Sequence, residues 1–182
     1  MTTDEQLADA AKNGSESAFN ELVARHRDKL FRFLVTRCAS HADAEDAIQD
    51  TFVNVYRYLH SFNPRWRFST WLYRIAIRNA ARQPVDRAQQ DTEIADPVGP
   101  LQQCIDHSER ENLWLAAKRL LAPDAFTAMW LHYVEDMPVK DVSHALERSV
   151  SWTKVTMLRS RRKLTQELGK KTATEVGSQS YG

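Results

Sequence analysis

Glycine, proline and cysteine are all scarce in this sequence, which has five, six and two of them in 182 residues. Strand-like alternation of apolar and polar residues is also missing, whereas apolar residues recur at the three- and four-residue spacing of a helix. Cys38 and Cys104 are isolated thiols without CxxC spacing. That favours free cysteines in a reducing compartment over a disulfide. The sequence therefore predicts an all-α protein with no disulfide framework.

The chain also lacks the patterns that carry chemistry or cross membranes. Its six histidines are scattered without metal-ligand spacing, and no glycine-rich phosphate loop, nucleophile elbow or HExxH occurs. No apolar run reaches the length of a membrane span, and the polar start MTTDEQLADAAKNG has no signal-peptide core. We expect a soluble cytoplasmic protein that is not an enzyme, with no cofactor, no metal and no membrane insertion.

Charge is segregated along the chain, although the net charge is only +1. Residues 61–87 hold six arginines against one acid, and residues 147–171 hold eight lysines and arginines against two acids. Between them, residues 88–109 carry five acids and no lysine or arginine. A uniformly solvated surface would not need this pattern, so the two basic segments are candidate anion-binding regions.

Helix signals divide the chain into two groups of helices joined by a polar segment. Asn13-Gly14 is a helix stop and Ser15 a helix start, and both Ser69 and Ser149 are placed to cap later helices. The predicted helices cover about 4–12, 15–34, 41–60, 69–82, 107–121, 123–134, 138–146 and 150–168. The segment 83–106 holds three prolines and a glycine with few large apolar residues, which is typical of a linker.

The stretch RFSTWLYRIAIRN at residues 67–79 combines a buried stripe with a line of arginines. Arg74, Arg78 and Arg82 follow one another at four-residue spacing, where like charges cost about 0.2–0.5 kcal/mol per pair. Such a line indicates an external anion. Arginine interleaved with aromatics suits single-stranded nucleic acid, whose bases stack on rings while guanidinium groups hold phosphates. Trp66 lies in the preceding loop and is a better candidate for exposure than Trp71.

Three aspartates share one face of the predicted helix 41–60, namely Asp43, Asp46 and Asp50. The simplest interpretation is a solvated face, and the more specific one is a docking surface for a basic protein partner. A metal site is a third, although oxygens from one helix rarely complete a coordination shell.

The segment 138–164 has the order of a helix-turn-helix: a short helix, a tight turn near Glu147 and a longer basic helix. The start of the second helix would reach base edges in the major groove, and its basic residues would lie near phosphates. The inward stripe is predicted to consist of Thr153, Met157, Ser160 and Leu164. Trp152, Val155 and Leu158 would then either touch thymine methyl groups or, with the helix rotated, belong to the core.

DAEDAIQDTFVNVYRYL followed by TWLYRIA resembles region 2 of the extracytoplasmic-function (ECF) group of bacterial sigma factors, which belong to the sigma-70 family. The segment from LLAPDAF to RSRRKL is similar to their region 4. The resemblance implies a region 2 helical bundle over 1–82, a flexible acidic linker over 83–107, a region 4 helix-turn-helix over 108–168 and a disordered tail over 169–182. It implies a subunit that binds RNA polymerase core, recognises −35 and −10 promoter elements and promotes DNA melting in transcription initiation.

The resemblance also implies partners and residues for each surface. Core polymerase would be bound at its β′ clamp helices and β flap, and an anti-sigma factor would occlude both domains. The residues implied for the β′ clamp are Asp46, Gln49, Asp50 and Phe52. Those implied for the −10 element are Asn63, Arg65, Trp66, Arg67, Tyr73, Arg74, Arg78, Asn79 and Arg82. Those implied for the −35 element are Ser149, Ser151, Trp152, Lys154, Val155, Thr156, Arg159 and Arg162.

An alternative function is a helix-turn-helix transcriptional regulator whose N-terminal helices dimerise or sense a ligand. It explains the C-terminal half of the chain but gives no purpose to the arginine and aromatic segment 62–82.

Overall fold

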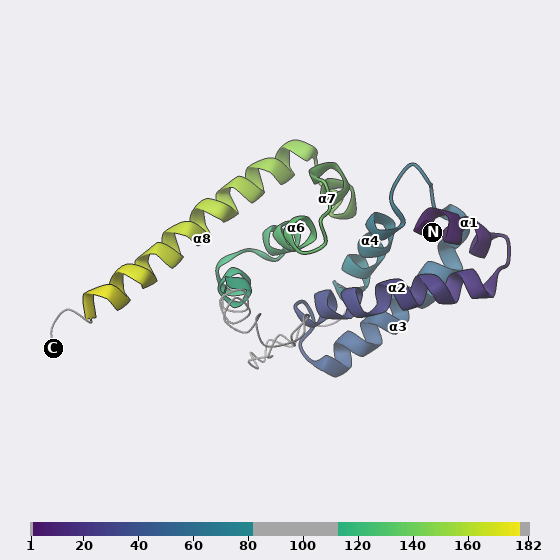
Figure 1. The fold of residues 1–182 in the computed structure, drawn as a ribbon, viewed down its shortest axis with the longest axis horizontal. Coiled ribbons are helices and arrows are strands. Elements are labelled where there is room, and N and C mark those ends of the chain that lie inside the picture. The colour runs from purple at the N-terminus through teal and green to yellow at the C-terminus, as the bar shows by residue number, and fades with distance from the viewer. Residues whose placement is uncertain (1, 82–112, 179–182) are drawn as a thin grey trace. The chain divides into compact units, whose positions relative to one another are not determined.

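A computed structural model of the chain describes residues 2–81 and 113–178, with side chains described up to residue 167. Within these ranges every regular element is helical and no strand occurs, which confirms the all-α prediction (Figure 1). The predicted linker 83–107 and Arg82 lie outside the described residues. No helix in the described ranges is both long and apolar enough to cross a membrane.

The described residues form two compact units. The first contains residues 2–81 together with 140–147, and the second contains 113–139 together with 148–178. The short helix α7, Val139–Ala145, is thus grouped by its contacts almost entirely with the first unit.

The first unit is built from four main helices, whose bounds follow local signals. Helix α1 spans Asp4–Lys12, α2 Glu16–Val35, α3 His41–Tyr58 and α4 Phe68–Ala80, and a 3₁₀ turn spans Leu59–Ser61. As predicted, α1 ends at Asn13, and Gly14 follows with a positive φ of 96°. The Ser15 hydroxyl accepts the Ala18 N–H at the start of α2, also as predicted.

Helix α4 begins one residue earlier than expected, and Ser69 is not its N-cap. Arg67 occupies the N-cap position without a side-chain capping bond. The Phe68 N–H instead donates to Oε1 of Glu5 on α1 at 3.1 Å. A carboxylate from another helix therefore satisfies the first amide of α4, whereas the sequence predicts a cap by the local Ser69 hydroxyl.

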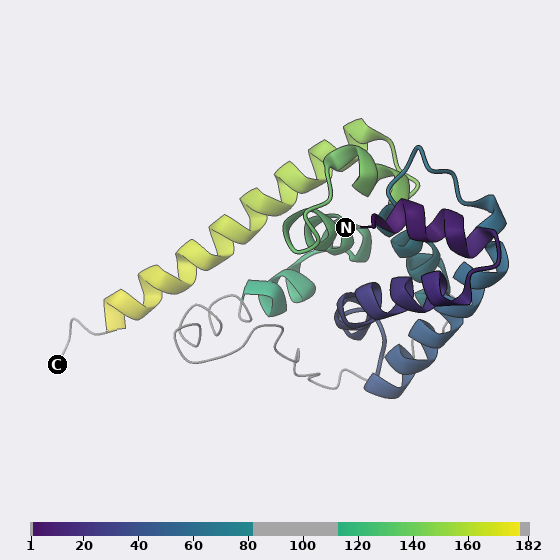
Figure 2. The ribbon, with the colours of Figure 1, turned by 45° about the vertical axis from the view of Figure 1, so that its right-hand side comes forward.

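The core of the first unit lies where α2, α3 and α4 meet. Helices α2 and α3 run side by side, as the views in Figures 1 and 2 agree. The large side chains with almost no exposure include Phe33 and Leu30 from α2, Val55 from α3, and Phe68 and Leu72 from α4. Of the apolar stripe in RFSTWLYRIAIRN, Phe68, Leu72 and Ala76 are buried as the spacing predicts, whereas Trp71 and Ile75 are half-buried. This burial fixes the helix face on which Arg74 and Arg78 lie.

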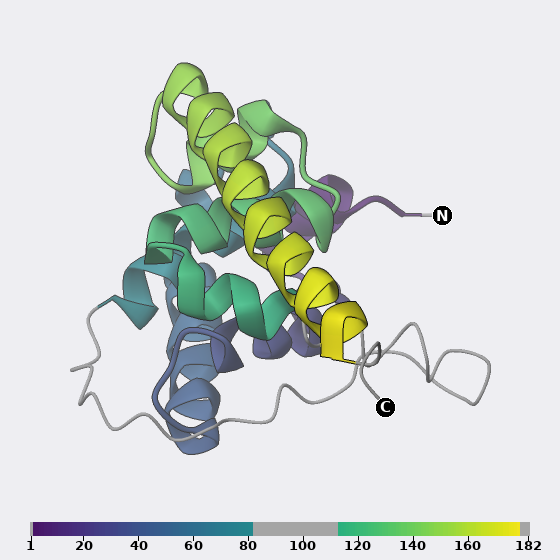
Figure 3. The ribbon, with the colours of Figure 1, turned by 90° about the vertical axis from the view of Figure 1, so that its left-hand side faces the viewer.

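The second unit packs two shorter helical segments against the long C-terminal helix. Residues 113–120 are helical, α6 spans Pro123–Tyr133 with proline in its first turn, and α8 spans Val150–Ser178. Trp114 meets Phe126 and Trp130 edge-on, at centroid distances of 5.8 and 5.1 Å. Met157 and Leu164 of α8 are buried as well. Figure 3 shows α8, in yellow-green to yellow, crossing in front of these elements.

Helix α8 continues beyond its predicted end at Leu168. The sequence predicts a disordered tail over 169–182, whereas the backbone of residues 169–178 is helical in the structure. Gly169 alone costs a helix interior about 1 kcal/mol relative to alanine, and the residues that follow it include good helix formers such as lysine and alanine. Residues 179–182 lie outside the described part of the chain.

Candidate nucleic-acid interface

Helix α3 presents an acidic ridge that also carries large apolar side chains. Asp46, Gln49 and Asp50 are all exposed. The ridge continues at helical spacing to Val53 and Tyr56, which are 55% and 59% exposed. The sequence did not indicate these two residues as a surface, because apolar side chains of an amphipathic helix usually belong to its buried face. We call Asp46, Gln49, Asp50, Val53 and Tyr56 the α3 ridge.

The other two candidates on α3 are less accessible than the ridge. Phe52 is half-buried. Asp43 belongs to the start of the helix, because its N–H donates to the Ser40 hydroxyl at 3.1 Å and its carboxylate accepts from that hydroxyl at 2.8 Å. Its role is therefore helix capping. In the described residues, no group of three or more His, Cys, Asp and Glu is arranged to hold a metal ion.

The loop before α4 places three of the predicted side chains at the surface. Arg65 and Arg67 are exposed, and Trp66 is half-buried. Trp66 lies parallel to His144 of α7 with ring centroids 3.8 Å apart, and Lys140 lies 5.3 Å from the Trp66 ring. The Trp66 ring is thus already used as a stacking platform by cationic and aromatic neighbours. Asn63 has a local role as well, since its Oδ1 accepts the Arg65 N–H at 3.0 Å and shapes the turn.

Arg74 and Arg78 lie together on α4 and share an anionic partner in the first unit. Both guanidinium groups donate to the Glu147 carboxylate, with Arg78 Nε at 3.1 Å from Oε2. Hydrogen bonds from Arg78 and then Arg74 lower the pKa of Glu147, against the opposing effect of burial. Burial and the neighbouring Arg74 charge lower the pKa of His144. The arginine pair therefore forms a local positive site that holds one carboxylate in the free chain.

Two residues predicted for this surface make contacts within the first unit instead: Tyr73 is buried and Asn79 is half-buried. Tyr73 is only 2% exposed, and its ring packs edge-on against Phe33 at 5.2 Å. Asn79 joins α4 to α3: its Oδ1 accepts from Asn54 Nδ2 at 3.2 Å, and its Nδ2 donates to Thr51 Oγ1 at 3.3 Å. Both polar ends of the amide are occupied, so we remove Tyr73 and Asn79 from the candidate DNA surface.

Replacing Asn79 by alanine is expected to destabilise the first unit by about 1–2 kcal/mol, because the part-buried Asn54 amide loses its acceptor. Urea unfolding followed by circular dichroism measures this change. The conservative variant Asn79→Asp keeps an acceptor for Asn54 and should lose less. A loss of DNA affinity in Asn79→Ala without any loss of stability would contradict this interpretation.

One face of helix α8 is buried. Thr153, Met157, Ser160 and Leu164 are at most 6% exposed, which confirms the predicted stripe. At the start of the helix the Ser149 hydroxyl accepts the Trp152 N–H at 3.1 Å, so this serine acts as a cap. Before it, Glu147 has a positive φ of 56°, the conformation for which glycine is more usual in such turns.

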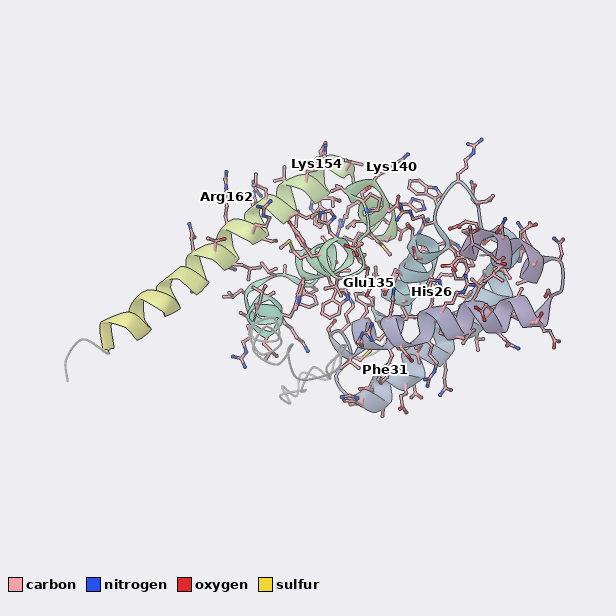
Figure 4. The ribbon with its side chains drawn as sticks, viewed as in Figure 1. His26, Phe31, Glu135, Lys140, Lys154 and Arg162 are labelled. Atoms are coloured by element: carbon pink, nitrogen blue, oxygen red, sulfur yellow. The ribbon has the colours of Figure 1, made fainter. Side chains whose placement is uncertain are left out.

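Over residues 148–166 the outward face of α8 is basic and carries no acid. The exposed or half-buried candidates on it are Ser151, Trp152, Lys154, Val155, Thr156, Arg159 and Arg162. Figure 4 labels Lys154 and Arg162 along this helix. Arg148, in the turn, pairs with Asp124 at 2.7 Å and lies 5.2 Å from the Trp152 ring. The start of this face therefore carries polar, apolar, aromatic and basic side chains, and the part further along the helix is basic.

Comparison with known proteins places this arrangement in a family. The model for sigma-70 region 2 matches residues 22–89. The ECF RNA polymerase sigma-E factor of Haemophilus influenzae is 31% identical over 175 residues, which cover 87% of this chain and 92% of that protein. The Escherichia coli K12 protein of the same description is 41% identical over 78 residues, covering 43% of this chain and 40% of its own length. The chain belongs to the ECF group of RNA polymerase sigma factors, as its resemblance predicted.

Solved structures agree at the level of the fold. The structure of CnrH in complex with the cytosolic domain of CnrY matches with a TM-score of 0.70 and 24% identity, over 92% of this chain and 97% of that one. The sigma factor RpoE of Bartonella quintana, solved with the anti-sigma factor NepR, matches with a TM-score of 0.63 and 20% identity, over 83% and 96%. The all-α architecture is thus shared with known sigma factors.

Proposed function

We propose that this ECF sigma factor binds core RNA polymerase, recognises −35 and −10 promoter elements, and promotes DNA melting. In this proposal residues 1–82 form region 2 and residues 108–168 form region 4. The observation that carries the proposal is that the first unit presents an acidic, apolar ridge on α3 and a separate arginine and aromatic surface at residues 65–78. A transcriptional regulator would use α8 but would have no need of these two surfaces.

The α3 ridge is the proposed contact with the β′ clamp helices. Exposed carboxylates at Asp46 and Asp50 supply charge complementarity for a basic partner, and Val53 and Tyr56 supply apolar area. Tyr56 also meets Phe19 of α2 edge-on at 5.0 Å, which orients its ring while leaving it 59% exposed. An oriented, exposed aromatic ring loses little side-chain freedom when a partner covers it.

The proposed −10 surface consists of Arg65, Trp66, Arg67, Arg74 and Arg78, together with Arg82 outside the described residues. Stacking and guanidinium–phosphate contacts suit a non-template strand that has been unpaired. In this proposal a DNA phosphate would replace the Glu147 carboxylate that Arg74 and Arg78 hold in the free chain, because the planar guanidinium group can donate two parallel N–H bonds to either oxyanion.

Helix α8 is the proposed reader of the −35 duplex, with Ser151, Lys154, Val155 and Thr156 near base edges. The second unit is also the proposed contact for the β flap. An anti-sigma factor is a further proposed partner, since the related CnrH and Bartonella RpoE structures were solved with CnrY and NepR. The protein would act in the cytoplasm as an initiation factor, with the polymerase supplying the chemistry.

Two experiments test the function directly. Gel filtration with core polymerase should show co-elution, and run-off transcription on a promoter library should return templates that share two elements. A chain that binds duplex DNA but neither co-elutes with core polymerase nor supports run-off transcripts would be a regulator, and the proposal would be wrong.

Replacing Arg159 and Arg162 by alanine is expected to weaken −35 duplex binding similarly for all sequences and to reduce the slope of log K against log salt by about two, about one per lost phosphate contact. Fluorescence anisotropy at several salt concentrations measures the slope. Arg27→Ala, a loss of charge on α2 in the other unit, serves as the control. An unchanged slope in the α8 variant would remove these two residues from the DNA surface.

A further inference from the structure

Two large apolar side chains stand exposed in the middle of the basic face of α8. Val155 is 45% exposed and Leu158 is 46% exposed. Their neighbours Lys154 and Arg159 are exposed cations. Apolar groups among cations gain nothing from phosphates, so they require another explanation than general attraction to DNA.

The helix cannot rotate to bury these side chains. Thr153 and Met157, two residues on either side of Val155, are 0% and 6% exposed, and at 100° per residue this places Val155 nearly opposite to both. The Thr153 hydroxyl also donates to the Ser149 carbonyl at 3.0 Å, in the first turn of the helix. Of the two alternatives that the sequence left open, the core location is thereby excluded.

Trp152, near the start of α8, is less accessible than Val155. Trp152 is half-buried, and the Arg148 guanidinium lies 5.2 Å from its ring centroid. Arg148 is in turn anchored to Asp124 at 2.7 Å. Val155 is therefore a free apolar group near the start of the helix, and Leu158 lies almost one turn further along.

Charge complementarity identifies what covers this face. Residues 148–166 contain six lysines and arginines and no acid. As a partner, a polyanion fits this charge better than a protein surface with few acidic residues. In the major groove of duplex DNA the apolar group offered by the bases is the C5-methyl of thymine. We propose that Val155, together with Leu158, reads thymine methyl groups and so sets part of the −35 specificity. This inference rests on the proposed role of α8 in binding the −35 duplex.

The test uses deoxyuridine, which pairs as thymidine does but lacks the methyl group. A −35 duplex is selected with the full-length chain and core polymerase, and each thymine is replaced singly by deoxyuridine. The affinity of the full-length chain is then measured by anisotropy. At one or two positions the affinity for the duplex should fall about fourfold when the methyl group is removed, the ratio that corresponds to burial of one methyl-sized group. Val155→Ala should bind the thymine duplex about as weakly as the wild type binds the critical deoxyuridine duplex, and should show no further loss there.

Thr165→Ala, an exposed position further along α8, is the matched control and should keep full sensitivity to deoxyuridine. If the wild type binds the selected duplex equally with and without every methyl, or if no thymine is selected, the inference is wrong while the proposed function stands. If no duplex is selected at all, the proposed function fails first. If Val155→Ala keeps its sensitivity to deoxyuridine and instead loses self-association in sedimentation, the pair is a surface for a second copy, which also overturns the inference.

Discussion

Replacing both Asp46 and Asp50 by arginine is expected to lower the affinity of the chain for core RNA polymerase by about a hundredfold, or ~2.7 kcal/mol. Both carboxylates are exposed on α3, beside the apolar side chains of Val53 and Tyr56. In the proposed complex each substitution replaces an attraction to the basic partner by a repulsion, at the rim of the apolar contact made by Val53 and Tyr56. Because neither carboxylate lies in the first turn of the helix, the fold should be almost unaffected.

Competition against a labelled wild-type chain on core polymerase measures this loss. The matched control is Asp9→Arg with Asp28→Arg, which makes the same change in charge at exposed positions of α1 and α2. Binding of the isolated chain to a −35 duplex should be the same for both double variants, because α8 is untouched. If the control loses as much core affinity as the α3 variant, the effect is one of net charge and the α3 ridge is not the docking surface.

Local signals were sufficient to predict where most helices begin and end. Asn13 and Gly14 end α1, Ser15 starts α2, and Ser149 starts α8, each through atoms within a few residues of one another. The inward stripe of α8 was predictable for the same reason, since helical spacing alone determines which residues share a face.

Partners distant in sequence explain what could not be predicted. The first amide of α4 is satisfied by Glu5, which lies 63 residues away, and no spacing rule indicates that contact. Asn79 looked like a side chain for base edges because Asn54 and Thr51 come close to it only after α3 and α4 have packed. The apolar part of the α3 ridge was not predicted either, because apolar residues of an amphipathic helix are usually buried. Val53 and Tyr56 are nevertheless more than half exposed.

Replacing both Arg74 and Arg78 by alanine is expected to reduce open-complex formation by about a hundredfold while core affinity stays within about twofold. Hydrogen bonds to charged groups contribute about 1.5–3 kcal/mol each, so the loss of one such contact per arginine corresponds to about 3 kcal/mol or more. Permanganate reactivity of unpaired thymines around the −10 element measures opening. Binding of the holoenzyme to a single-stranded non-template oligonucleotide measures capture of the strand.

The control for this pair is Arg27→Ala with Lys29→Ala, which removes two exposed cations from α2 and leaves α4 intact. The α4 variant also loses its ion pairs with Glu147, but exposed pairs contribute about 0–1 kcal/mol, so urea unfolding should show only a small change. A premelted promoter separates two mechanisms. If the arginines hold the unpaired strand, the defect persists on the premelted template; if they act only on the duplex before melting, premelting restores activity and the assignment of this surface is wrong.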